Sequence, residues 1–202
     1  MKNFKGIVYA ALSSSTFGLA PLFSILLLSD GFSSFEVLSY RWGVASLTLG
    51  IVGLAGGCRF RISRQELCTV FFLSLFRAAT SLSLVIAYQN ISSGVASIIH
   101  FMYPLAVALA MMCFFRERGS VWTFAAVGLS IVGAVLLSQG NAGFARGNTT
   151  LGIVSSVVSV VAYGGYIVGV RKSRAVEIDS TVLTCYVMAF GALMFIVGGC
   201  FT

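Results

Sequence analysis

Two arginines lie inside long apolar runs of the sequence, at positions 41 and 77. A guanidinium group carries five N–H donors in a planar fork and can hold a carboxylate or phosphate bidentately. Arg77 is about 16 Å from either end of its run at the rise of an α-helix, too far for its side chain to reach interfacial water. We expect it to face a bundle interior, where it holds an anionic group of a bound molecule or hydrogen-bonds helix carbonyls and fixes packing. Ser74, Thr80, Ser81 and Tyr88 share its face.

Arg41 lies about 9 Å inside the outer end of its own apolar run. Snorkelling to the membrane surface explains a charge at that depth. Its helical face also carries Ser34, Ala45 and Thr48. These small and polar neighbours indicate an interior position, where Arg41 is a second candidate for contact with a substrate.

His100, the only histidine of the chain, lies about 12 Å inside a run at 92–115. It is the one mid-span group whose reference pKa suits proton coupling, and it is equally suited to a neutral hydrogen bond between helices. Pro104 lies in the same run and is expected to kink the helix. At 100° per residue one face is small and polar: Ser93, Ala96, Ser97, His100, Tyr103, Pro104 and Val107. His100 and Tyr103 on this face are further candidates for contact with a substrate.

Four consecutive hydroxyl residues, Ser13 to Thr16, fall at mid-depth of the first apolar run, with Gly18 and Pro21 after them. They cover all faces of a helix, so some of them point inward. We expect Ser13 and Thr16 to line a substrate cavity, or to bond the carbonyls four residues earlier.

The acidic residues all lie at the ends of apolar runs or in loops: Asp30, Glu36, Glu66, Glu117, Glu177 and Asp179. Glu117 stands between two arginines, which favours a structural ion pair. Because no carboxylate lies deep in a span, the sequence offers no buried glutamate that could couple transport to cations. The sequence contains no phosphate loop, metal-ligand set or nucleophile–base pair, so we expect no enzyme activity, cofactor or metal site.

The composition indicates an all-α integral membrane protein. Of the 202 residues 58% are hydrophobic and 9% charged, against about 25% charged in soluble domains. The mean hydropathy is +0.98. The net charge of +7 needs no nucleic-acid partner, because basic loops are the sorting signal of multispanning proteins. The expected partners are the lipid bilayer and a small polar or anionic metabolite.

Seven spans are predicted, at about 6–28, 35–57, 67–88, 92–115, 120–138, 151–170 and 181–201. Ten lysines and arginines fall in the loops of one side and one in those of the other. The positive-inside rule therefore places the N-terminus in the cytoplasm and the C-terminus after seven spans outside the cell inner (plasma) membrane.

A shift of 146 residues aligns the Gly-Ile-Val triplet at 6–8 with that at 152–154, and Tyr40 with Tyr186. We therefore expect a first five-helix repeat at 1–140 and a partial second repeat of two helices at 150–202. Five spans make the second repeat start from the opposite side of the membrane. Inverted repeats are the build of many secondary transporters.

These features resemble EamA-type transporters of the drug/metabolite transporter superfamily. The fourth span of that family starts with small residues, contains a proline and ends with an acidic residue, which match Ser92–Ser97, Pro104 and Glu117. Its glycine-rich fifth span matches Gly128–Leu137, the glycine of its first span matches Gly18, and the arginine of its second span matches Arg41. The resemblance implies a permease or exporter of small metabolites, and Pro104, Gly18 and Glu117 as structural or gating positions.

The family contains ten spans in two halves, so the resemblance also implies a chain truncated after its seventh span. Two functions follow as alternatives, a secondary transporter or a non-transporting membrane fragment of one. A homodimer is one way in which a seven-span chain could close its cavity.

Overall fold

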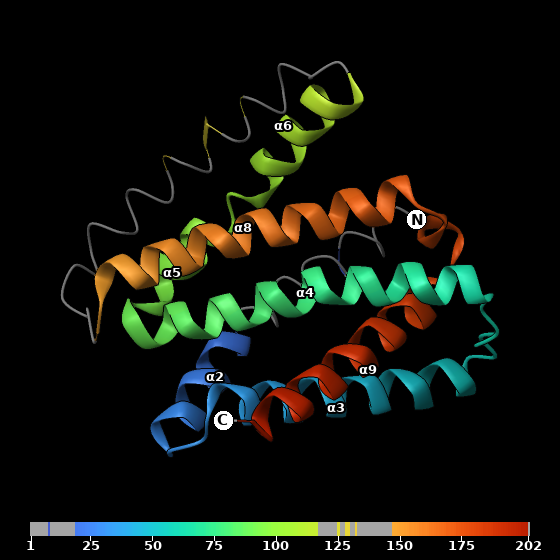
Figure 1. The fold of residues 1–202 in the computed structure, drawn as a ribbon, viewed down its shortest axis with the longest axis horizontal. Coiled ribbons are helices and arrows are strands. Elements are labelled where there is room, and N and C mark those ends of the chain that lie inside the picture. The colour runs from blue at the N-terminus through green and yellow to red at the C-terminus, as the bar shows by residue number, and fades with distance from the viewer. Residues whose placement is uncertain are drawn as a thin grey trace.

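The computed structural model describes residue 8, residues 19–116, residues 125, 128, 129 and 132, and residues 147–201. Among these residues the chain forms helices and no strand, which confirms the all-α fold (Figure 1). In chain order the elements are α2 (Leu19–Ser29), α3 (Ser34–Ala55), α4 (Arg64–Asn90), α5 (Ser93–His100), α6 (Tyr103–Phe115), α8 (Thr149–Lys172), the 3-10 helix η1 (Arg174–Glu177) and α9 (Ser180–Gly199).

Five segments of the described chain are long and apolar enough to cross a bilayer: α3, α4, α5 together with α6, α8 and α9. Each of these segments begins and ends within three residues of the corresponding predicted span's first and last residues. Helix α2 covers the end of the first predicted span, and the fifth, at 120–138, falls mostly outside the described residues. The count of seven spans stays a prediction.

Three of the acidic residues, Glu36, Glu66 and Asp179, lie at the starts of helices. Ser33 and Glu36 form a capping box at the start of α3, and Ser63 and Glu66 form another at the start of α4. The Asp179 carboxylate accepts hydrogen bonds from two backbone N–H groups at the start of α9. A carboxylate at a helix N-terminus satisfies orphan donors and complements the helix dipole.

The connections α3–α4 and α8–α9 lie at the same end of the bundle. Arg174 Nη1 donates to Gln65 Oε1 at 2.8 Å, and the Tyr186 hydroxyl donates to the Phe60 carbonyl at 2.8 Å. Lys172 Nζ lies 4.6 Å from the centre of the Phe115 ring, which brings the end of α6 there too. Basic residues of three predicted loops therefore gather at one end: Arg59, Arg61, Arg64, Arg116, Arg171, Lys172 and Arg174.

Two helix pairs dominate the packing: α3 runs along α9, and α4 runs along α8 (Figure 1). Helices α3 and α9 are antiparallel, since Gly53 faces Thr181 at one end and Phe35 faces Gly199 at the other. Between these ends the Trp42 ring lies against Gly191. An added Cβ at Gly191 would overlap the indole, so glycine is what allows this close approach.

The predicted kink near Pro104 is present as a break between two helices. Helix α5 ends at His100, residues 101 and 102 form a turn, and Pro104 lies in the first turn of α6, where its missing N–H breaks no helical hydrogen bond. The break interrupts the continuous polar face predicted for 93–107. His100 is buried, whereas Pro104 is exposed.

The fit of Trp42 against Gly191 makes a testable prediction about stability. We expect Gly191→Ala to lower the free energy of unfolding by about 1–3 kcal/mol, because the methyl group overlaps the indole. The matched control is Gly43→Ala in α3, where an added Cβ meets no atom of the described residues within 4 Å. The control should be neutral or stabilising, since alanine favours helix more than glycine. Equal thermal unfolding midpoints for both variants in detergent would contradict the packing argument.

Candidate binding cavity

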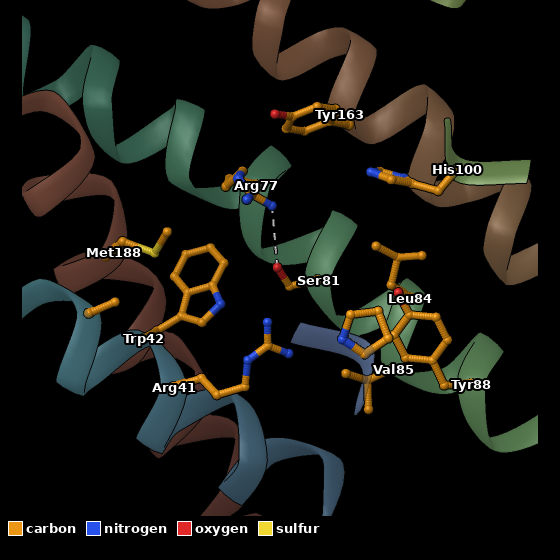
Figure 2. A pocket seen from close by; sticks show the side chains of 12 residues that line it. Arg41, Trp42, Arg77, Ser81, Leu84, Val85, Tyr88, His100, Tyr163 and Met188 are labelled. Atoms are coloured by element: carbon orange, nitrogen blue, oxygen red, sulfur yellow. Dashed lines mark hydrogen bonds between the residues drawn. The ribbon is translucent and has the colours of Figure 1, made fainter. Parts of the chain in front are cut away.

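The described helices enclose a cavity of about 290 Å³ (Figure 2). This volume is close to the lower limit of ~300–1,000 Å³ that is usual for small-molecule pockets. Residues of α2, α3, α4, α5, α8 and α9 line it: Pro21, Arg41, Trp42, Ala45, Arg77, Ser81, Leu84, Val85, Tyr88, His100, Tyr163 and Met188. Three of the residues singled out in the sequence, Arg41, Arg77 and His100, thus border one space.

Arg77 is at the centre of α4, thirteen residues from each end of the helix. Its Nη1 lies 3.5 Å from Ser81 Oγ, one turn further along the helix. The guanidinium carbon lies 5.0 Å from the Tyr163 ring centre and 5.8 Å from that of Trp42, and Figure 2 shows the group between these two side chains. Aromatic faces attract a cation through the ring quadrupole, so neutral groups of α3 and α8 hold this charge.

Arg41 enters the cavity from α3. Its Nη1 donates a hydrogen bond of 2.6 Å to Ser24 Oγ of α2. This bond directs the guanidinium into the bundle, and it ties α2 to α3. The structure therefore places Arg41 in the interior, one of the two positions that the sequence left open.

His100 ends α5 and connects it to α8. Its Nδ1 lies 3.0 Å from Ser159 Oγ, and the Ser159 hydroxyl donates to the Ser156 carbonyl at 2.6 Å. Because the hydroxyl proton of Ser159 is used in the bond to Ser156, His100 Nδ1 donates to Ser159 Oγ. In a neutral ring Nε2 is then an acceptor. The contact is an interhelical hydrogen bond, one of the two roles expected for His100. The role in proton coupling stays a prediction.

Tyr103 supports the cavity without lining it. Its ring packs edge-on against that of Tyr163, with ring centres 4.5 Å apart, and it lies 5.7 Å from the His100 ring. The His100 and Tyr163 rings are 5.4 Å apart. Tyr103 therefore packs against Tyr163, which contacts Arg77, and is not among the residues that line the cavity. Its direct contact with a substrate stays a prediction.

The cavity is positively charged. Among the described residues that line it, two are arginines and none is an aspartate or glutamate. In a low-dielectric interior such charges are strongly felt by any bound molecule. Figure 2 shows both guanidinium groups directed into the same space, with the Trp42 ring beside them.

Sequence reasoning missed the aromatic and sulfur side chains of the cavity: Trp42, Tyr163 and Met188. The position of Trp42 next to Arg41 was the one sequence signal that could have indicated its place in the cavity. Nothing in the spacing of α8 or α9 indicates which of their apolar residues meet α4. The predicted positions Ser13, Thr16, Gly18 and Glu117 lie outside the described residues.

Long apolar helices around a charged cavity define a polytopic membrane protein with an internal cavity. Residues 4–139 match the EamA-like transporter family, and the chain belongs to that family.

Two known relatives are similar to this chain. An uncharacterized transporter of Archaeoglobus fulgidus is 27% identical over 192 residues, which cover 95% of this chain and 62% of the relative. An uncharacterized transporter of Synechocystis is 30% identical over 95 residues, covering 46% of this chain and 29% of the relative. The chain thus spans less than two thirds of the length of either. Both relatives are named as uncharacterized transporters.

The bond between His100 and Ser159 can be tested with a double-mutant cycle. His100→Phe keeps an aromatic ring and Ser159→Ala removes the hydroxyl. We expect a coupling free energy of about 0.5–2 kcal/mol, typical of side-chain hydrogen bonds between membrane helices. The measurement is the free energy of unfolding of the four proteins in detergent. Single effects that add to within about 0.3 kcal/mol would show that the contact contributes nothing.

Proposed function

We propose that this chain forms a substrate pathway of a secondary transporter, which moves a small polar metabolite with an anionic group across the cell inner (plasma) membrane. The observation that carries the proposal is the cavity lined by Arg41 and Arg77 and, among described residues, by no acid. Unpaired charges inside a membrane bundle are costly and usually mark substrate or ion pathways. A bound anion would offset that cost.

The chemistry of binding follows from the groups around the cavity. The planar fork of Arg77 presents N–H donors to a carboxylate or phosphate. Trp42 and Tyr163 restrict the rotation of that fork, because each offers a ring face to it. Arg41, fixed by Ser24, supplies donors from a second helix. Together these groups would orient an anion within the bundle.

An inverted repeat would let the cavity open alternately to each side. Two observations support units at 1–140 and 150–202. Helices α3 and α9, with their N-cap residues Ser33 and Asp179, begin 146 residues apart, the offset of the sequence repeat. The two helices also pack antiparallel, as inverted units require.

Substitution of Arg77 tests the proposal. The assay is counterflow of labelled organic acids and phosphate in proteoliposomes at equal protein content. We expect Arg77→Gln to lower the flux of the transported compound at least tenfold, since a charge-assisted hydrogen bond contributes about 1.5–3 kcal/mol. The control Arg61→Gln removes an exposed arginine outside the cavity and should leave flux unchanged. A parent chain that moves no compound of the panel supports the alternative, a non-transporting membrane fragment.

The proposed orientation places the basic end of the bundle in the cytoplasm. In a background without native cysteines, Arg61→Cys should react with a membrane-impermeant thiol reagent only after the membrane is opened. Asp30→Cys, in the turn between α2 and α3, should react in intact cells. The reverse pattern would contradict the proposed orientation while leaving the fold unchanged.

A further inference from the structure

We propose that the ligand of this cavity carries two negative charges and no positive charge, as a dicarboxylate or a phosphate monoester does. The inference rests on the proposed function and narrows its substrate class. It follows from the number of charges around the cavity and from the partners that those charges already have.

The first step is the charge balance. Arg41 and Arg77 line one cavity of about 290 Å³, so a single small molecule can meet both guanidinium groups. Each of them is held by a neutral serine hydroxyl, Ser24 or Ser81. A monoanion would compensate one positive charge and leave the other without a counter-charge in a low-dielectric space. A dianion compensates both.

The second step concerns the donors that remain. A guanidinium group has five N–H donors, and the serine bonds use one from each arginine. Among the described residues, no fully buried side-chain nitrogen or oxygen lacks a hydrogen-bond partner. The remaining donors therefore border accessible space, where ligand oxygens can accept from them.

The third step disfavours a ligand ammonium group, and with it the amino-acid type of substrate. A carboxylate or an aromatic ring face compensates the charge of an ammonium group inside a protein most effectively. The described residues lining the cavity include no carboxylate. The rings of Trp42 and Tyr163 already contact the guanidinium group of Arg77, and the hydroxyl of Tyr88, the other tyrosine of the lining, lies 3.5 Å from Ser97 Oγ. An ammonium group would meet repulsion from two arginines without a compensating partner.

The test compares ligands that differ in charge and little in size. The full chain in lipid nanodiscs is titrated at pH 7.5 with succinate, butyrate, ethyl phosphate and alanine, and affinity is measured by calorimetry. Succinate and butyrate have the same four-carbon length and differ by one carboxylate. We expect succinate or ethyl phosphate to bind at least tenfold more tightly than butyrate and alanine. Whichever of the two binds more tightly identifies the source of the charges, two carboxylates or one phosphate.

Variants test the assignment to the two arginines. Arg41→Gln and Arg77→Gln should each lower dianion affinity at least tenfold and remove most of the preference over butyrate, whereas Arg61→Gln should change neither. Equal affinities for succinate, ethyl phosphate and butyrate in the parent, or tighter binding of alanine, would overturn the inference and leave the proposed transport of anions standing. A parent that binds none of the anions would overturn both.

Discussion

A positive charge at the centre of a helix bundle, with no acidic partner in the described part of the chain, is the constraint on which this structure depends. Burying an arginine in the membrane costs several kcal/mol unless the surrounding groups compensate it. At Arg77 the compensation comes from neutral groups, two aromatic faces and one hydroxyl. This arrangement keeps the side chain inside the bundle and leaves its charge available to a ligand. A carboxylate in the same place would have neutralised the site.

That arrangement in turn depends on helix packing some distance from the charge. Trp42 reaches Arg77 from α3, and its ring is backed by Gly191 of α9 and by Phe195, whose ring centre is 5.3 Å away. Tyr163 reaches Arg77 from α8, backed in the same way by Tyr103. The close contact of α3 with α9 and of α4 with α8 is therefore what places two aromatic rings beside one guanidinium group. Small residues at these contacts have a role in the site although they touch no ligand.

The charged residues lie in three kinds of location. Among the described residues, acidic residues lie at helix starts and in loops, the basic residues of three loops gather at one end, and the interior contains two arginines and a histidine. Acidic residues at helix starts compensate the helix dipole, basic loops are the sorting signal of membrane proteins, and arginines inside a bundle usually mark substrate or ion pathways. The segregation explains how a chain with 9% charged residues can still contain a strongly charged site.

The sequence by itself determined the class of protein and the approximate position of its spans, because the length of an apolar run and the placement of its charges are local properties. It also singled out Arg41, Arg77 and His100 as candidates for the interior, since a charge or an imidazole stands out in an apolar run. Only the tertiary structure decided that these three residues border one cavity, and that Trp42 and Tyr163 hold Arg77. An aromatic residue in an apolar span has no distinguishing pattern, and its role depends on which helix passes beside it. That choice is made by packing between segments far apart in the chain.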